Sequence, residues 1–210
     1  MLKKHYRHQM GGFALTTVAW LLCCISMGLP QWRVWYYEDP KIFKPTVAFV
    51  GIWRACVVHS GNNTKEIRIC HQYNYRDNFL PLYIRINQHL LLMSSFLGLF
   101  GKITTIIALW KVCMGREWRN AICNPFSLSG ILNIIASSFL YLAVLFNYIS
   151  IMRKWGIAFP PSFHMPSHPD TQKIGSAMVL AITAAVFFLI SGIICLSSNL
   201  AIGKTPRSKN

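Results

Sequence analysis

The sequence has few charged residues and very few acidic ones. Only 13% of its 210 residues are charged, against about 25% in typical soluble proteins. Six residues are Asp or Glu, so general acid–base catalysis has few candidate side chains. The sequence also contains no phosphate-binding glycine loop, no paired catalytic carboxylates, no catalytic His–Cys–Asp spacing and no internal repeat. These absences argue against an enzyme and predict no cofactor or catalytic metal.

Long apolar runs take the place of the missing charge, since 53% of the residues are hydrophobic. A hydrocarbon core near 30 Å thick needs about 20 apolar residues in each helical span. Four runs meet this requirement, at about 12–30, 90–110, 127–149 and 175–201. None contains Asp or Glu, and Lys102 is their only Lys or Arg. The sequence therefore predicts a membrane protein with four transmembrane helices in one domain over residues 1–210.

Basic residues outside the runs predict the orientation. Segments 1–10, 111–124 and 202–210 carry nine Lys or Arg in 33 residues, whereas segments 31–85 and 151–174 carry 11 in 79. The density is about twofold higher in the first set, so we expect both termini to be cytoplasmic. The net charge of +15 suggests nucleic acid as a partner, but there is no soluble basic domain to bind it. We expect the inner basic residues to lie against anionic lipid instead.

The first run has an alternative interpretation as a cleaved signal peptide. It follows a basic start, and Ser26-Met27-Gly28 has the small-residue pattern of a cleavage site. Its apolar stretch is longer than most signal-peptide cores, which favours a retained helix.

The interval between the first two runs predicts a small sheet. Strand-forming residues occupy 32–37, 46–59 and 65–73, with a turn composition at 60–63. Cys56 and Cys70 are symmetric about position 63, so a hairpin folded there would place them opposite each other, close enough for a disulfide. The same register sets Val58 against Arg68 and His59 against Ile67.

A zinc site is the alternative for these cysteines, with His59 and His71 as the other ligands. Cys70 and His71 are adjacent on a predicted strand, however, and would point to opposite faces. The pattern therefore favours the disulfide over a metal.

The same interval resembles the first extracellular loop of the claudin family. The resemblance lies in Pro30-Gln31-Trp32-Arg33-Val34, then Gly51-Ile52-Trp53, then Cys56 and Cys70. The chain departs from the family pattern in two ways. Ile52 stands in place of Leu, and thirteen residues separate the two cysteines where the family usually has fewer. The resemblance implies an α+β membrane protein, an antiparallel four-transmembrane-helix bundle with a small extracellular antiparallel β-sheet. Trp32, Trp53 and the disulfide would anchor that sheet at the membrane surface.

Weaker similarity extends into the second apolar run. Arg85 resembles the arginine that follows a short outer helix in claudins, and Gly98 and Gly101 resemble a glycine pair there. Lys102 departs from the family and lies nine residues, or about 13 Å of helix, from Lys111. An intramembrane charge is a candidate functional residue. The alternative is a lysine packed against a polar neighbour such as Asn133.

The resemblance implies a plasma-membrane protein of tight junctions that contacts itself and other claudins, within one membrane and between cells. The first loop, 31–85, carries eight basic and four acidic residues, and this positive charge predicts a barrier or an anion-favouring pore. The candidate charge-selectivity residues are Arg54, Lys65 and Arg68. Phe159 and Phe163 in the second loop, 151–174, are candidates for contact with a facing cell.

Three further features concern modification and partners. Asn62 begins a glycosylation sequon, and Cys113 and Cys123 are candidates for palmitoylation, with plain thiols as the alternative. The tail Ser208-Lys209-Asn210 lacks the hydrophobic end that PDZ domains bind, so we do not expect a PDZ scaffold as partner.

The alternative function is a four-span auxiliary subunit that modulates a channel or receptor in the same membrane.

Overall fold

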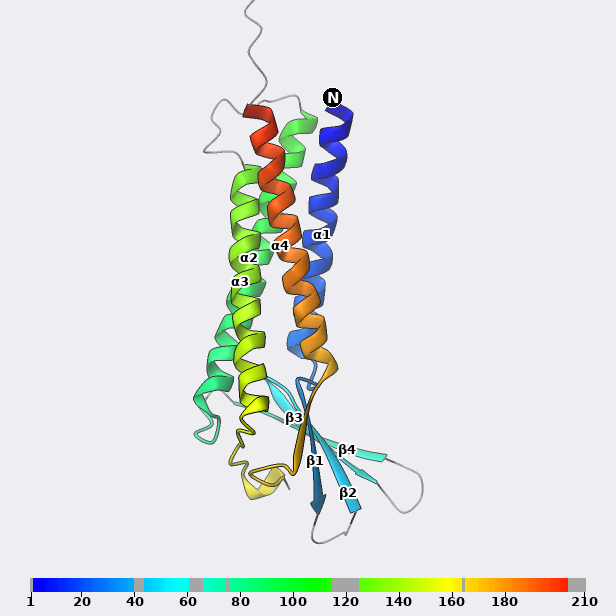
Figure 1. Cartoon of the computed structure of the whole chain (residues 1–210), viewed down its shortest axis with the longest axis vertical. Helices are drawn as coiled ribbons and strands as arrows, with labels where there is room; N and C mark the ends of the chain where they lie inside the picture. Colours follow the sequence, from blue (N-terminus) through cyan, green and yellow to red (C-terminus); the bar gives the residue numbers. More distant parts are fainter. Residues whose placement is uncertain are drawn as a thin grey trace, which may run out of the picture. The chain divides into compact units, whose positions relative to one another are not determined.

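Four long helices form the larger part of the chain. The computed structural model describes residues 2–39, 44–60, 66–74, 76–114, 125–163 and 165–203. The helices among them are α1 (Leu2–Gly28), α2 (Leu82–Cys113), α3 (Pro125–Met152) and α4 (Ser176–Gly203) (Figure 1). Each contains a stretch that is long and apolar enough to cross a membrane. The four predicted membrane helices are confirmed.

The helices extend beyond the predicted runs, most clearly at the start of α2. This helix begins at Leu82 rather than near residue 90, and the carbonyl of Pro81 accepts the N–H of Ile84 at 3.0 Å. The segment is polar in sequence, but Asn87 and Gln88 are fully buried within the protein. Hydropathy alone predicted the start of α2 about eight residues too late, because these polar side chains face packed protein rather than lipid.

The chain divides into two compact units. We call residues 1–23, 92–140 and 183–210 the helical unit, and residues 24–91 and 141–182 the sheet unit. Both units contain segments of all four helices.

Glycines allow close helix contact in the helical unit. A Cβ atom added to Gly98 would lie 2.5 Å from the ring of Phe188 in α4. A Cβ atom on Gly101 would lie 2.6 Å from Oδ1 of Asn133 in α3. A larger side chain at either position would have to displace a side chain of a neighbouring helix, so both glycines lie at close helix contacts.

Polar side chains also connect the helices of this unit. The hydroxyls of Thr16 in α1 and Ser191 in α4 lie 2.5 Å apart, and Asn133 donates to Thr16 at 2.9 Å. Asn133 is an example of the polar neighbour expected for Lys102, and the lysine ammonium lies 4.0 Å from the ring centre of Trp20. The contact that the structure gives to Lys102 is therefore with an aromatic ring of α1.

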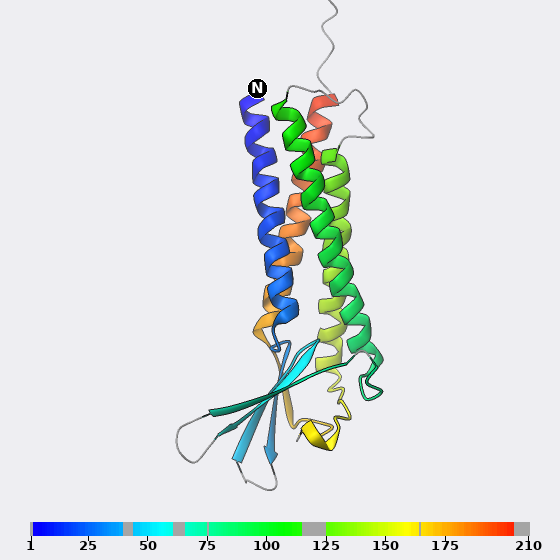
Figure 2. The same cartoon turned by 180° about the vertical axis from the view of Figure 1, so that it is seen from behind.

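The sheet unit contains a five-stranded antiparallel sheet, in the order β4-β3-β2-β1-β5. Its strands are β1 (Arg33–Asp39), β2 (Lys44–Val50), β3 (Arg54–Ser60), β4 (Glu66–Gln72) and β5 (Thr171–Ile174) (Figure 1). Seen from behind, the longer strands fan out from the end where they meet the helices of this unit (Figure 2). The predicted small antiparallel sheet is confirmed.

The register of the β3–β4 hairpin agrees with the sequence arithmetic. Cys56 pairs with Cys70, Val58 with Arg68 and His59 with Ile67.

One face of the sheet packs against the rest of its unit. Trp35, Ala48, Ala55 and Val57 point to this face and are buried. The covering residues come from the approach to α2 and from the second loop, and they are Tyr73, Phe79, Leu80, Tyr83, Ile84, Ile157, Phe159, Phe163 and Met165. The strand alternation therefore separates a core face from an outward face.

Two features of the sheet differ from the expectation. The β-prone run at 46–59 is divided into β2 and β3 by a turn at Gly51–Trp53. The short strand β5, from the second loop, pairs with β1 through Arg33↔Ile174 and Tyr36↔Thr171. The second loop is therefore part of the sheet rather than a separate appendage.

Candidate functional site

Trp32 belongs to the first-loop signature, the residues on which the claudin resemblance rests, and lies where α1 ends and the sheet begins. Its side chain is 0% exposed, and its indole Nε1 donates to the carbonyl of Ser26 at 2.8 Å. Ser26 belongs to the last turn of α1. The buried ring thus holds the start of β1 against the end of the helix.

Gly51 forms the tight turn between β2 and β3. Its N–H donates to the carbonyl of Arg54 at 2.9 Å. A Cβ atom at this position would lie 2.7 Å from Cα of Pro30 and 2.9 Å from the Arg54 carbonyl oxygen. Both neighbours are backbone atoms that cannot rotate away, so the turn requires glycine.

The next two residues join the turn to α2 and to the end of β4. Ile52 is 1% exposed, and its carbonyl accepts a hydrogen bond from Gln88 Nε2 at 2.9 Å. The carbonyl of Trp53 accepts the N–H of Tyr73 at 2.9 Å. The backbone of Gly51–Trp53 therefore joins the turn to α2 and to the end of β4, while the Ile52 side chain is buried.

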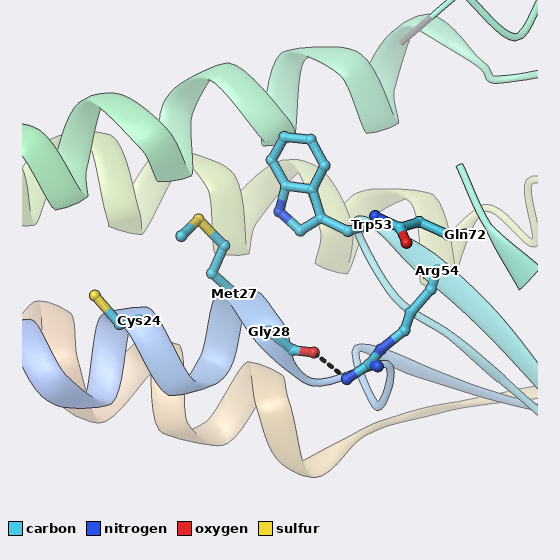
Figure 3. Close-up of a pocket in the computed structure, with 6 residues that line it drawn as sticks. All are labelled: Cys24, Met27, Gly28, Trp53, Arg54 and Gln72. Carbon is cyan, nitrogen blue, oxygen red and sulfur yellow. Dashed lines mark hydrogen bonds between the residues drawn. The ribbon is translucent and has the colours of Figure 1, made fainter. Parts of the chain in front are cut away.

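Arg54 satisfies a carbonyl at the end of α1. Its Nη2 atom donates to the Gly28 carbonyl at 2.8 Å, and the side chain remains exposed (Figure 3). The C-terminus of a helix carries unpaired carbonyls and partial negative charge, so a cation there is favourable. Arg54, a predicted charge-selectivity residue, thus stabilises the junction between helix and sheet and still presents its charge to solvent.

The Arg54 side chain borders a pocket of about 250 Å³. The pocket is lined by Cys24, Met27, Gly28, Trp53, Arg54 and Gln72 (Figure 3). Small-molecule sites usually measure about 300–1,000 Å³ and enclose most of the ligand. This pocket is smaller and open, and it does not have the form of a substrate site.

Cys56 and Cys70 form a disulfide between β3 and β4, with their Cα atoms 4.0 Å apart. The zinc alternative does not fit this arrangement, because both thiols are used in the bond. His71 points to the other face, where its ring stacks on Phe163 with ring centres 4.3 Å apart.

Arg33, the first residue of β1, is buried on the core side of the sheet, which its sequence motif did not predict. Arg33 is 1% exposed; its Nε donates to Asn147 Oδ1 at 2.7 Å and its Nη1 to the Tyr83 hydroxyl at 3.3 Å. Burial lowers the pKa of Arg33 from its usual value. Strand alternation was the available signal, because Arg33 falls on the same face as Trp35 and Tyr37.

The outward face of the sheet carries exposed charges and rings, and we call it the disulfide face. Strand alternation and register place on it Val34, Tyr36, Glu38, Val47, Phe49, Arg54, Cys56, Val58, Arg68, Cys70, Gln72, Thr171 and Lys173. The guanidinium of Arg68 lies 5.3 Å from the Phe49 ring centre, and the ammonium of Lys173 lies 5.2 Å from that of Tyr36. Each cation keeps its charge exposed while resting on an aromatic ring.

The second-loop phenylalanines lie on the core side of the sheet. Phe163 is 8% exposed and stacks with Phe159 at a ring-centre distance of 5.4 Å. Phe159 also meets Trp35 edge to face at 5.7 Å. This placement favours a packing role for Phe163 over the predicted contact with a facing cell.

The remaining predicted residues are placed as follows. Arg85 donates through Nη2 to the Asp77 carbonyl at 2.7 Å and so holds the entry to α2. Asn62, Lys65 and Cys123 lie outside the described residues, as does the side chain of Cys113 at the end of α2.

Comparison with known proteins gives one consistent result. A family model described as PMP-22/EMP/MP20/Claudin tight junction matches residues 17–197. Claudin-2 of Mus musculus is 27% identical over 188 residues, covering 89% of this chain and 76% of that protein. Claudin-6 of Homo sapiens is 24% identical over 188 residues, covering 88% and 78%. Claudin-like protein ZF-A9 of Danio rerio is 25% identical over 207 residues, covering 90% and 85%.

Proposed function

Because the chain belongs to the PMP-22/EMP/MP20/Claudin tight junction family, and so is a structural membrane protein rather than an enzyme, we propose that copies of its sheet unit associate to seal or line the paracellular gap. Association within one membrane and between facing cells would arrange the disulfide faces along that gap. Since its relatives include Claudin-2 and Claudin-6, claudins are the natural partners beside a second copy of this chain.

The proposed orientation places the sheet unit outside the cell and both termini in the cytosol. The Cys56–Cys70 disulfide supports this, because disulfides persist on the oxidising side of a membrane. Glycosylation of Asn62 would also require the first loop to lie on the non-cytosolic side of the membrane. We expect glycosidase treatment to shift the mobility of the protein, and Asn62→Gln to abolish that shift. In the cytosol, Cys113 and Cys123 would be available for palmitoylation.

The proposed selectivity is for anions. The observation that carries it is the set of exposed cations on the disulfide face, among which Arg68 and Lys173 each rest on a ring. These two lie on the two edge strands, four strand spacings or about 19 Å apart. That separation exceeds the Debye length of about 8 Å at physiological salt, so each cation repels passing cations independently. Glu38 is the acidic residue whose side chain the structure describes on this face.

Dilution potentials in a leaky epithelial monolayer test the proposal. Expression of the chain should raise the chloride-to-sodium permeability ratio or lower total conductance. For an ion that passes one Debye length from a side-chain charge, reversing that charge changes the chloride-to-sodium permeability ratio roughly fivefold. Arg68→Glu or Lys173→Glu should therefore lower this ratio by about that factor. Arg153→Glu is the matched control, because this exposed arginine lies outside the sheet. A monolayer that becomes more permeable to sodium than to chloride would refute anion selectivity.

Homotypic contact has a separate test. When expressed alone in cells without junctions of their own, the chain should form strands at cell–cell contacts visible by freeze-fracture. Strands that appear only with a second claudin would refute homotypic assembly and leave the charge argument intact.

A second candidate function is lateral association with a channel or receptor in the same membrane. The observation that favours it is Lys102, a charge within an apolar helix whose surface is otherwise suited to lipid. Co-purification with a channel, away from cell contacts, would support this function over the junctional one.

A further inference from the structure

Lys102 lies at the surface of the helical unit. It is half-buried in α2, and the neighbouring side chains of Phe100, Ile103 and Ile106 are exposed and apolar. The surrounding surface therefore matches lipid, and the lysine interrupts it with a charge.

The ammonium group turns away from the nearer end of its helix. It lies 4.0 Å from the ring centre of Trp20 in α1. That indole donates to the carbonyl of Ser95 at 3.2 Å, and its Cδ1 would lie 3.5 Å from a Cβ on Gly98. Ser95 and Gly98 precede Lys102 in α2, whereas Lys111 follows it by about 13 Å of helix. The side chain thus does not snorkel toward the Lys111 end, where phosphate head groups would meet it.

The chain cannot supply a carboxylate to Lys102 within the membrane. All six acidic residues lie outside the four membrane-spanning stretches. A second copy has the same sequence, so its spans also bring no Asp or Glu. The ring of Trp20 is the partner that the structure gives to the ammonium, and a ring compensates a charge less completely than a carboxylate.

We propose that Trp20 and Lys102 form a lateral docking site for a transmembrane helix of a different protein, one that carries an Asp or Glu at this depth. The carboxylate would pair with the ammonium, and the apolar residues around Lys102 would pack against the partner helix. Trp20 acts as a positioning residue that holds the lysine toward the α1–α2 surface. The site is independent of the sheet, so this association and the paracellular role are separable.

A peptide of about 20 residues, leucine-rich and with one central Asp, serves as the probe. Energy transfer from this labelled peptide to the labelled full-length chain is measured in bilayers and compared with an otherwise identical Asn peptide. Polar pairs between membrane helices support a preference for the Asp peptide of roughly tenfold. Lys102→Met should abolish the preference, whereas Lys111→Met, on the same helix, should retain it. Trp20→Leu should weaken it.

Three outcomes would overturn the proposal. The first is equal association of the Asp and Asn peptides with the unmodified chain. The second is an Asp preference that persists in Lys102→Met. The third is a Lys102-dependent contact with spin-labelled anionic head groups that displaces the Asp peptide, since the lysine would then be a lipid ligand. Formation of the Cys56–Cys70 disulfide in each variant verifies that it has folded.

Discussion

The buried contact between Arg33 and Asn147 allows a quantitative prediction about the sheet unit. Arg33 follows the signature tryptophan, and its Nε donates to Asn147 Oδ1 of α3 at 2.7 Å. The acceptor is a neutral amide, and among the described residues the guanidinium is stabilised by hydrogen bonds and the Tyr83 ring rather than by a counter-charge. Asn147→Leu removes the acceptor and leaves the buried charge in place.

The magnitudes follow from what each substitution leaves unpaired. A hydrogen bond to a charged group contributes about 1.5–3 kcal/mol, and losing a partner inside the protein adds desolvation, so Asn147→Leu should cost about 3 kcal/mol. Arg33→Met removes the charge but leaves the amide oxygen without its donor, at about 1–2 kcal/mol. The double variant replaces both partners with apolar side chains and should cost less than the sum. We expect a coupling energy of about 2–3 kcal/mol.

Denaturant unfolding in detergent micelles, followed by tryptophan fluorescence, measures all three variants against the unmodified chain. Tyr148→Leu is the control, because this neighbour of Asn147 on α3 is exposed. Additive single effects, with a coupling energy below about 0.5 kcal/mol, would show that the contact does not support the sheet unit.

Three further substitutions probe the same unit by its unfolding free energy. Tyr73→Phe should stabilise it by about 1 kcal/mol, because the Tyr73 hydroxyl is buried and the described part of the chain gives it no hydrogen-bond partner. Burial raises the pKa of Tyr73, so the folded state keeps this hydroxyl neutral. The unfolding free energy is therefore unaffected below the unfolded pKa of about 10 and falls at higher pH, where the unfolded tyrosine ionises. The Phe variant cannot ionise and should resist alkaline unfolding better. Gly51→Ala should destabilise by roughly 1–3 kcal/mol, and an unchanged midpoint would contradict the backbone clash at 2.7 Å. Replacing Cys56 and Cys70 with Ser should cost about 3 kcal/mol, and a loss below 1 kcal/mol would show that the disulfide adds little.

The membrane helices and the disulfide could be predicted because their signals are local. A span is a continuous apolar run, and a hairpin register follows from the turn between two strands. Cys56 and Cys70 are equidistant from position 63, so the position of the turn is enough to predict their pairing.

The features that the sequence did not reveal depend on contacts between distant segments. Strand β5 has four residues, and it becomes a strand because β1 pairs with it. Phe159 and Phe163 occupy a loop sequence that suggested exposure, yet they pack with Trp35 and Tyr73. Lys102 could be recognised as an intramembrane charge, but its contact with Trp20 could not, because the ring comes from another helix.

Backbone hydrogen bonds, together with the Cys56–Cys70 disulfide, position the disulfide face. At one edge, Gly175 donates its N–H to the carbonyl of Trp32 at 3.1 Å, and Ala177 donates to Gln31 at 3.0 Å. These bonds join the start of α4 to the end of α1 through the β1–β5 pair. Outward residues such as Arg68 and Lys173 take no part in this framework, so their charge can change without moving the strands. The charge reversals proposed above should therefore alter ion selectivity while leaving the unfolding midpoint of the sheet unit unchanged, and a lowered midpoint would show that the cation–ring contacts are structural.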